Sequence, residues 1–553
     1  MNLFLIFIAI VIITCVMLNN ATNRVGVPVL LAFILLGMLF GNNGLLPVKV
    51  ESYKAVEQIC SAALIFIMFY GGFGTRWDAA RPVAAESVLL ATAGVVLTAG
   101  FTGAFCHFLL RWQWPEALLM GSVVASTDAA SVFSILRSRK LGLKNGTAPL
   151  LELESGSNDP CSYMLTAVML SVMQGTASGG QIMWQLFAQL FFGAVLGLLI
   201  AQAAAFGLRH ITFATSGFDS MFLIAVALFA YAIPAAVGGN GYLSAYIVGI
   251  ILGNRSFSGK KEMVHFFDGF TGLMQVLIFF MLGLLAHPAE LHRCILPALA
   301  IFFIMLLVSR PLATLLLLTP FGKYGFRQQT LISFCGLRGA ASIVFAIMAV
   351  GSGVNMAHDI FNIVFCIVLL SISLQGTLLP FVAKRLGMID KEADVMKTFS
   401  DFSDEVPLQF THVPIHADGS WTNKRVRDLG IPRGMLLCLV VKPDGSQQVP
   451  VGDTLLEDGD SVILCTKAYD GKLAIPVREH TVSAHSRWDG IPVRDYPSGH
   501  DRLILIRRDG KDIIPHGDTL IHAGDHLYIN RVQDVRDTAM AYHNKNNNHT
   551  LSK

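Results

Sequence analysis

Long apolar runs recur along the chain from residue 3 to residue 382, separated by short polar segments. Most runs approach the ~20 residues that an α-helix needs to cross a bilayer. They predict thirteen membrane-spanning helices, at residues 3–19, 27–43, 59–74, 84–110, 116–136, 149–174, 182–207, 219–237, 241–253, 264–286, 294–318, 328–350 and 358–382. The first run lacks a basic leading segment and an A-x-A cleavage site, so we expect a retained helix. The pattern predicts a polytopic α-helical membrane protein.

Charged residues are distributed unevenly along the chain. They make up 14% of the 553 residues, but 35 of 386 (~9%) before residue 387 and 44 of 167 (~26%) from there on. A share near 25% is ordinary for a soluble domain. We therefore expect a membrane domain at 1–386, a linker at 387–405 and a soluble part after it. The composition argues against a large water-soluble enzyme, and no basic patch indicates a nucleic-acid partner.

The Lys and Arg residues between the predicted spans indicate the orientation. Fifteen lie on one side of the membrane and four, namely Lys49, Lys54, Arg111 and Arg293, lie on the other. Basic residues concentrate in cytoplasmic loops. The distribution supports the count of thirteen spans. It predicts an N-terminus outside and a cytoplasmic C-terminal part, in a cell inner membrane.

Five charged residues fall deep inside predicted spans: Asp128, Glu154, Asp159, Arg310 and Arg338. A charge at the centre of a membrane helix costs at least about 2.5–3.5 kcal/mol, so these residues should face the bundle interior and find partners there. The structural alternative to a function is a buried ion pair that only ties helices together. We favour that alternative for Glu154 and a function for Asp159.

The segment ESGSNDP, which ends at Pro160, gives Asp159 an unusual setting. If its helix begins near Pro149, Asp159 lies about ten residues, or ~15 Å, into the membrane. Ser155 and Asp159 are four residues apart and share one helix face. Gly156 and Pro160 predict a loosened backbone whose freed carbonyls can bind cations or water.

Two other spans carry polar residues at their middle. Span five contains Ser126-Thr-Asp-Ala-Ala-Ser131, and span twelve contains Cys335-Gly-Leu-Arg-Gly-Ala-Ala-Ser342. They are an odd number of spans apart and so run in opposite directions, as the crossed broken helices of inverted-repeat transporters do. Thr127 and Asp128 can offer oxygens to a hydrated cation. Asp128 can alternatively cap the amides of a broken helix, and Arg338 can neutralise a helix C-terminus.

Taken in order, Thr127-Asp128, Asn158-Asp159-Pro160 and Gly336-Leu-Arg-Gly339 resemble the motifs of the monovalent cation:proton antiporter-1 superfamily, of the NhaP and sodium/proton-exchanger type. The resemblance covers about residues 5–385. It implies a six-helix core domain, a dimerisation bundle and a homodimer in the lipid membrane. It also implies that Asp159 binds the cation and the proton in competition, and that Thr127, Ser155 and Asp128 complete the site.

The resemblance implies roles for the other polar residues as well. Asn158 would stabilise the broken helix of span five rather than titrate. An intramembrane Glu of this family pairs with an Arg of the eleventh span, which maps to Glu154 and Arg310, while a pairing of Glu154 with Arg338 stays open. Electrogenic relatives have two adjacent Asp and a Lys where this chain has Asn158-Asp159 and Arg310. One titrating carboxylate then implies one proton per monovalent cation, and hence electroneutral exchange.

The C-terminal part contains two similar units, at 406–467 and 478–532. Trp421 and Trp488 are 67 residues apart, and the pattern Asp-Gly…Pro…Gly-Asp-Thr…Gly-Asp recurs at an offset of 65 after Asp444. This is an internal duplication. Each unit predicts short strands with Asp-Gly turns and a helical stretch at Val-Arg-Asp, in an α+β domain. The pattern resembles the C-terminal subdomain of RCK domains (TrkA-C). The first unit fits it better, and the second could instead be a transporter-associated domain. Residues 533–553 predict a disordered tail.

Modules of the RCK type can bind small ligands, nucleotides among them, but no strand–GxGxxG–helix unit occurs here. We expect a transporter rather than an enzyme. It would exchange K⁺, or else Na⁺, for protons without a cofactor, under control of the C-terminal module. One alternative is a gated cation channel, although a filter such as TVGYG is absent. A second alternative is a Na⁺-selective exchanger with a ligand-sensing tail. A third is a membrane-anchored sensor without transport, but such a sensor would not need polar breaks in spans five, six and twelve.

Overall fold

The structure is a computed structural model. It describes residues 9–17, 29–41, 53–139, 141–176, 178–211, 217–255, 257, 260–288, 290–390, 408–417, 419, 421–432, 434–444, 446–467, 477–483, 486–496, 501–508 and 511–531. The chain divides into two compact units, Met1–Asp404 and Glu405–Lys553. The predicted linker from residue 391 on and the predicted tail at 533–553 lie outside the described residues.

The first unit is helical. After a helix at 9–17, its elements are α2 (Val29–Phe40), α3 (Tyr53–Gly74), α4 (Trp77–Ala80), η1 (Arg81–Val83), α5 (Ala84–Leu89), η2 (Leu90–Gly94), α6 (Val95–Phe108), α7 (Trp114–Val123), α8 (Ala129–Ser138), β1 (Gly142–Leu143), α9 (Thr147–Met173), α10 (Gly179–His210), α11 (Phe218–Ala236), α12 (Gly241–Gly253), α13 (Lys260–Leu285), α14 (Leu291–Ile304), η3 (Met305–Ser309), α15 (Arg310–Leu318), η4 (Thr319–Phe321), α16 (Phe326–Phe334), α17 (Ala340–Gly351), α18 (Ile360–Leu370), η5 (Ser371–Gln375), α19 (Gly376–Arg385) and β2 (Ile389–Asp390).

Each of the thirteen predicted spans overlaps one helix or a series of consecutive helices in the described residues, and two of these series contain a break. Within the described residues, seven helical segments are long and apolar enough to cross a membrane: Tyr53–Gly74, Trp77–Phe108, Gly179–His210, Phe218–Ala236, Glu262–Leu285, Leu291–Phe321 and Ile360–Arg385. The others are shorter, interrupted or more polar. The predicted fold class, a helical polytopic membrane protein, is confirmed.

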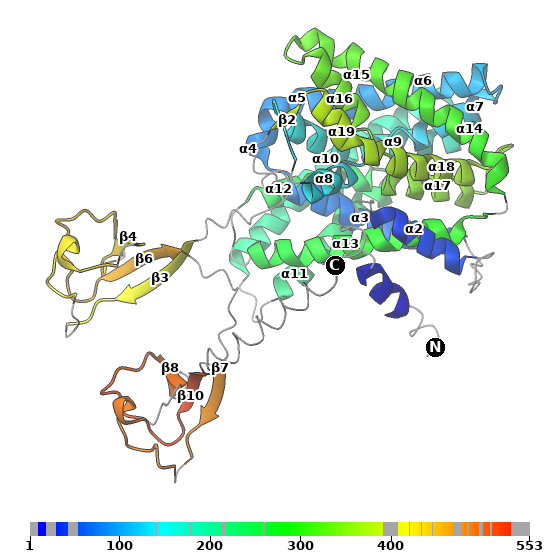
Figure 1. Ribbon diagram of the computed structural model, residues 1–553. Coiled ribbons are helices and arrows are strands. Elements are labelled where there is room, and N and C mark those ends of the chain that lie inside the picture. Colours follow the sequence, from blue (N-terminus) through cyan, green and yellow to red (C-terminus); the bar gives the residue numbers. More distant parts are fainter. Residues whose placement is uncertain are drawn as a thin grey trace, which may run out of the picture. The chain divides into compact units, whose positions relative to one another are not determined.

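The helices form two packed groups. In one group α3 packs on α12 and α13, and α13 on α2; in the other, α7 packs on α6 and α9, and α14 on α18. In Figure 1, α2, α3 and α13 lie along the lower side of this unit, and α6, α14 and α15 along the upper side. Helix α17 contacts both α3 and α18, so it lies where the groups meet.

Two spans are interrupted, as the sequence predicted. The fifth breaks between Val123, the end of α7, and Ala129, the start of α8; the twelfth breaks between α16 and α17. The predicted loosening of the sixth span is wrong, because α9 is one continuous helix through Pro160. A proline removes a single N–H, and a membrane helix tolerates it where neighbours satisfy the freed groups.

The second unit consists of two four-stranded antiparallel sheets. The first contains β3 (Leu408–Pro414), β4 (Met435–Val441), β5 (Gln447–Gln448) and β6 (Ser461–Lys467); the second contains β7 (Val477–Thr481), β8 (Asp501–Arg508), β9 (Lys511–Ile513) and β10 (His526–Arg531). The strand orders are β3-β6-β4-β5 and β7-β10-β8-β9, which are the same order in the two repeats. The duplication seen in the sequence is therefore a duplication of a folded unit.

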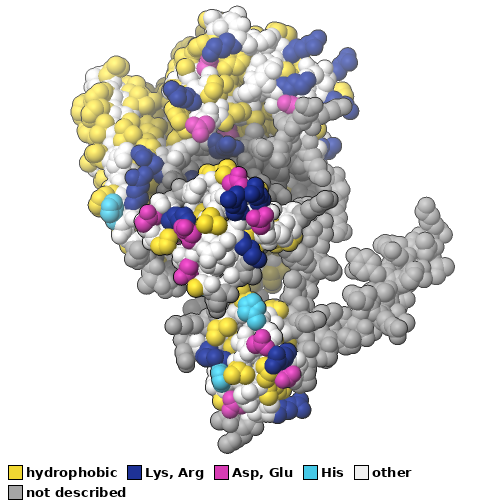
Figure 2. Space-filling model, turned by 90° about the vertical axis from the view of Figure 1, so that its left-hand side faces the viewer, with side chains coloured by type: hydrophobic (Ala, Val, Ile, Leu, Met, Phe, Trp, Pro, Cys, Tyr) yellow, Lys and Arg dark blue, Asp and Glu magenta, His cyan; other side chains and the backbone are white. Residues whose placement is uncertain are grey.

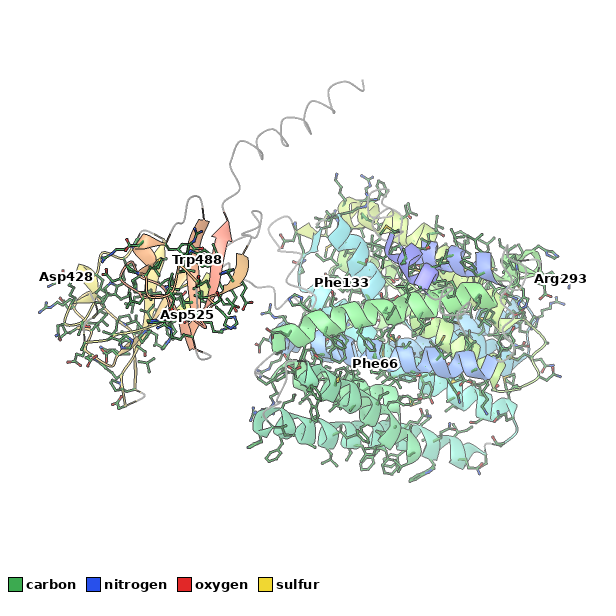
Figure 3. The ribbon with its side chains drawn as sticks, turned by 90° about the horizontal axis from the view of Figure 1, so that it is seen from below. Phe66, Phe133, Arg293, Asp428, Trp488 and Asp525 are labelled. Atoms are coloured by element: carbon green, nitrogen blue, oxygen red, sulfur yellow. The ribbon has the colours of Figure 1, made fainter. Side chains whose placement is uncertain are left out.

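The predicted α+β class of the second unit is corrected to a β-sheet class. Between residues 408 and 531, the described helical segments are two three-residue 3₁₀ turns, η7 (Val426–Asp428) and η8 (Val493–Asp495). The first turn stops because Gly430 takes a left-handed backbone conformation two residues later, with φ of 63°. In Figure 3, Trp488 and Asp525 lie in the second repeat.

Basic side chains are concentrated at one end of the helical unit. On the face shown in Figure 2, many Lys and Arg side chains gather over this unit beside an apolar flank. Figure 3 shows Arg293, one of the four predicted external residues, at the end of the bundle opposite to Phe133 of α8. The helices thus run between a strongly basic end and a weakly basic end.

Candidate functional site

A cavity of about 540 Å³ lies between the two helix groups. The break between α7 and α8 and the middle of α9 line it from one group, and α3 and α13 line it from the other. The predicted residues Thr127, Asp128, Ser155 and Asp159 all line this one cavity. Residues of two consecutive spans, the fifth and the sixth, thus meet at one cavity.

The two interrupted spans cross next to this cavity. The N–H of Asp128 donates to the carbonyl of Leu337 at 2.8 Å, and the hydroxyls of Ser126 and Ser342 lie 3.1 Å apart. Gly339 approaches so closely that a Cβ there would lie 1.9 Å from Oδ2 of Asp128. The crossing therefore requires glycine at 339.

Arg338 lies at the crossing and is buried. Its Nη1 donates to the carbonyls of Ala125 and Ser126 at 3.0 and 2.5 Å, just beyond the C-terminus of α7. Its own N–H donates to the hydroxyl of Ser371 at 2.9 Å. Carbonyls at a helix C-terminus carry partial negative charge, so a guanidinium placed here stabilises the broken end.

Glu154 pairs with Arg310. Nη2 of Arg310 donates to Oε1 of Glu154, and the two side chains are 2% and 1% exposed. Of the two pairings that the sequence left open, the structure contains this one. Arg310 is the first residue after η3, a π-turn, and π-turns re-aim side chains within membrane helices.

Asn158 and Ser155 hold the broken fifth span. The amide of Asn158 donates to Oγ1 of Thr127 at 2.6 Å and accepts from the N–H of Thr127 at 3.3 Å. The hydroxyl of Ser155 donates to the carbonyl of Thr127 at 2.7 Å and accepts from the N–H of Ala129 at 2.9 Å. Both side chains thus bond the backbone that the break leaves without helical partners.

Asp128 caps helix α8. Its two oxygens accept from the N–H of Ser131 at 3.1 Å and from the hydroxyl of Ser131 at 2.6 Å. This is the capping arrangement that the sequence analysis gave as the alternative role. Because Asp128 also lines the cavity, its carboxylate is held in place at the cavity wall.

Asp159 lacks the ion pair of Glu154, whose Oε2 also has no hydrogen-bond partner among the described residues, and it lacks the capping bonds of Asp128. It is 6% exposed, and its Oδ1 is buried without a hydrogen-bond partner in the described part of the chain. No ion pair of Asp159 occurs among the described residues, in contrast to Glu154. A buried carboxylate oxygen without a partner is costly. It is a position where a proton or a cation would supply the missing interaction.

The contribution of the other helix group to the cavity was not predicted from the sequence. Asp268 and Gln275 of α13 and Tyr70 of α3 line it opposite to Asp159. The hydroxyl of Tyr70 donates to Oδ1 of Asp268 at 3.4 Å. The available signal was an Asp at the fifth residue of the predicted span at 264–286, because acidic residues inside membrane spans are rare.

The family model for the transmembrane sodium/hydrogen exchanger matches residues 7–385. The chain belongs to the sodium/hydrogen exchanger family. The K⁺/H⁺ antiporter NhaP of Alkalimonas amylolytica is 32% identical to this exchanger over 474 residues, which cover 85% of this chain and 82% of the relative. NhaP2 of Shewanella oneidensis, also named a K⁺/H⁺ antiporter, is 32% identical over 478 residues with the same coverage.

A more distant relative of the exchanger is named for the other cation. The Na⁺/H⁺ antiporter ApNhaP of Aphanothece halophytica is 25% identical over 361 residues, which cover 62% of this chain and 67% of the relative. The solved sodium/proton antiporter MjNhaP1 of Methanocaldococcus jannaschii has the same fold, with a TM-score of 0.60 at 22% identity, over 68% of this chain and 100% of that one. The exchanger is therefore a cation/proton antiporter by family, and the channel alternative is not favoured.

The TrkA-C family model matches residues 477–537 of the exchanger. The match confirms the predicted module but falls on the second repeat, which the sequence analysis had ranked below the first. That ranking was wrong, because the motif used for it occurs in both repeats and both have the same strand order.

Proposed function

We propose that this exchanger moves K⁺ out of the cytoplasm in electroneutral exchange for protons, with Asp159 as the group that carries either one. The observation behind this proposal is the difference in bonding among the buried acids. Glu154 forms an ion pair with Arg310, and Asp128 accepts two hydrogen bonds from Ser131 that cap α8. Asp159 lines the cavity without an ion pair, and its buried Oδ1 has no hydrogen-bond partner among the described residues.

The coupling follows from exclusion at one carboxylate. Asp159 can hold a proton or a cation but not both, and the empty anion is costly to bury between the helix groups. If the two occupied forms change sides and the empty form does not, exchange is obligatory. Asn158 and Arg310 offer no second proton at neutral pH, because an amide does not titrate and a guanidinium stays charged. One monovalent cation then moves for one proton.

Thr127, Ser155 and Asp128 complete the proposed site around the cation. Their hydroxyl, carbonyl and carboxylate oxygens are hard ligands that suit K⁺ or Na⁺. Two relatives at 32% identity are named K⁺/H⁺ antiporters, and one at 25% is named for Na⁺. We therefore favour K⁺ as the substrate.

The charge distribution supports the orientation that we propose. With the basic end in the cytoplasm, as basic loops favour, the N-terminus lies outside. The cavity then opens towards the cytoplasm, because Asp268 lies eight residues into α13, whose first residue is Lys260. We further propose a homodimer in the inner membrane, with domains at 1–386, 406–467 and 478–532. The two sheet repeats would regulate transport by binding a small ligand, such as a nucleotide.

Proton flux in proteoliposomes tests the proposal. We expect Asp159→Asn to abolish cation-dependent alkalinisation while the protein still inserts and elutes as the wild type does. Ser134→Ala, which changes the wall of the same cavity, should retain activity. In the wild type, K⁺-driven flux should not change when the membrane potential is clamped at different values. Normal exchange by Asp159→Asn contradicts the assignment of the carrier, and a voltage-dependent rate contradicts electroneutrality.

A further inference from the structure

A second cavity, of about 250 Å³, lies on the other side of α9. Gly156 and Asp159 of α9 line the first cavity, whereas Leu153 and Pro160 of the same helix line the second. The ring of Tyr246 from α12 packs against Gly156, where a Cβ would lie 2.2 Å from the ring. Helix α9 thus separates the first cavity, which contains the polar residues of the proposed cation site, from the second cavity.

The wall of the second cavity is apolar. Val88 from α5, Leu243, Ile247 and Ile250 from α12 and Leu190 from α10 contribute to it. Two of its polar side chains bond the backbone instead: Nδ2 of Asn240 donates to the carbonyl of Pro160 at 2.8 Å, and the hydroxyl of Thr92 donates to the carbonyl of Val88 at 2.7 Å. Water needs two to four polar partners to stay in a cavity, so this wall favours a hydrocarbon occupant.

The cavity is elongated along the direction of the helices. Its lining includes both Asn240 and Ile250, which are ten residues apart and so separated by ~15 Å along α12. Its rim reaches the outer surface of the helical unit, where Val88 and Leu190 are 49% and 45% exposed. In a chain that spans a membrane, this rim faces the acyl chains of the bilayer.

At one end of the cavity lie side chains of the types that contact lipid head groups. Trp77 lines this end and is 43% exposed, and tryptophan is enriched where membrane and water meet. Arg76 directly precedes Trp77, and Arg81 is the first residue of η1, three residues before Ala84 of the cavity wall. Arginine binds phosphate groups through paired hydrogen bonds, and basic residues on the cytoplasmic side attract anionic lipids.

We propose that this cavity binds one acyl chain of an anionic phospholipid, with the phosphate of its head group at Arg81. The apolar wall accounts for the chain, and the exposed rim accounts for its entry from the bilayer. The tryptophan and the arginine at one end fix which end holds the head group. This site shares no lining residue with the cavity of the proposed cation site.

Photo-crosslinking of the full-length protein tests the proposal independently of transport. The probe is phosphatidylglycerol with a diazirine on one acyl chain, in vesicles of otherwise saturated phospholipid, and labelled peptides are identified by mass spectrometry. We expect labels on the peptides of α5 and α12 that line the cavity. Ala84→Phe, which fills the cavity, should reduce this labelling several-fold. Its neighbour Ala85→Phe, on the exposed side of the helix, should leave it unchanged.

Further variants test the head group and keep the proposal falsifiable. Arg81→Gln should lower the labelling by phosphatidylglycerol to the level seen with phosphatidylcholine, while Arg209→Gln, at the end of α10, should not. If Ala84→Phe does not fold, Ile247→Phe enters the same cavity from α12 and replaces it. If the cavity peptides are labelled equally in the wild type and in the filled variant, the label comes from bulk lipid around the protein. That result would overturn the proposed site. A label insensitive to head-group charge in the wild type would overturn the role of Arg81.

Discussion

The backbone N–H of Asp128 donates to the carbonyl of Leu337 at 2.8 Å, and this bond joins the two interrupted spans at their crossing. It brings the break of one span against the break of the other. Gly339 follows two residues later and leaves no room for a side chain beside Asp128. The geometry of the proposed cation site therefore depends on a residue that offers it no ligand.

Gly339→Ala should abolish transport. The added Cβ would lie 1.9 Å from Oδ2 of Asp128, so the crossing or the capped end of α8 must shift. Gly272→Ala is the matched control, because Gly272 lines the same cavity and a Cβ there meets nothing within 4 Å. Proton flux in proteoliposomes compares the two variants. Equal activity of both would show that the crossing is less tightly packed than the structure indicates.

Breaking the Glu154–Arg310 pair should strongly destabilise the protein. Arg310→Met or Glu154→Gln alone leaves a buried charged or polar partner unpaired, which for a buried pair costs ~3–5 kcal/mol. The double variant removes both charges and should be less destabilised than the two single changes together. Thermal unfolding of the purified protein measures the three variants.

The exposed pair of Arg425 and Asp453 provides the control for that experiment. Its side chains are 50% and 68% exposed, and exposed pairs contribute about 1 kcal/mol or less. Arg425→Met should therefore leave the melting temperature of the helical unit unchanged. If the Glu154 and Arg310 variants lower the melting temperature as little as Arg425→Met does, the buried pair does not stabilise the helix packing.

Asp268→Asn should raise the cation concentration at half-maximal rate with little change in the maximal rate. Asp268 lines the cavity on α13 without being one of the proposed ligands, so its charge attracts cations towards Asp159 over a distance. Such attraction is screened by salt, with a Debye length of about 8 Å at 0.15 M, so the effect should shrink at high ionic strength. Asp219→Asn, outside the cavity lining, should change neither parameter.

The sequence predicted the spans well because the bilayer imposes their length and polarity. The breaks in spans five and twelve were visible because Asp128 and Arg338 are polar where lipid-facing residues are apolar. The continuity of α9 was not visible, because the effect of a proline on a membrane helix depends on neighbours that lie far away in the chain.

The position of Asp268 and the partner of Glu154 show more clearly what the sequence alone does not determine. Both depend on which helices pack against one another, and apolar periodicity does not specify that. The resemblance to a family supplied the pairing of Glu154 with Arg310, whereas Asp268 lies in no motif and was passed over. The helical stretch expected at Val-Arg-Asp is present in both repeats, but only as a three-residue 3₁₀ turn.

The two sheet repeats contain the same buried acid with different partners. Asp460 pairs with Lys442 at 2.9 Å, and Asp525 pairs with Arg508 at 2.7 Å. Burial raises the pKa of Asp525, but hydrogen bonds from the guanidinium of Arg508 and the N–H of His522 outweigh burial and hold the pKa below its usual value. An acid with a depressed pKa stabilises the fold above its unfolded pKa, which is about 3.9 for Asp.

The second sheet should therefore lose stability only in acid, as the pH falls below about 4 and through the folded pKa of Asp525. Arg508→Gln removes the strongest bonds to the carboxylate but leaves it buried, so the pKa of Asp525 should rise and the loss should begin at a higher pH. Hydrogen exchange of β8 and β10 in the full-length protein, followed by mass spectrometry between pH 3 and pH 6, measures this shift, with β4 and β6 of the first sheet as the internal reference. Because only the second sheet contains Arg508, the variant should change the pH profile of β8 and β10 and leave that of β4 and β6 as in the wild type. An unchanged profile of β8 and β10 would mean that Arg508 does not hold the pKa of Asp525 down.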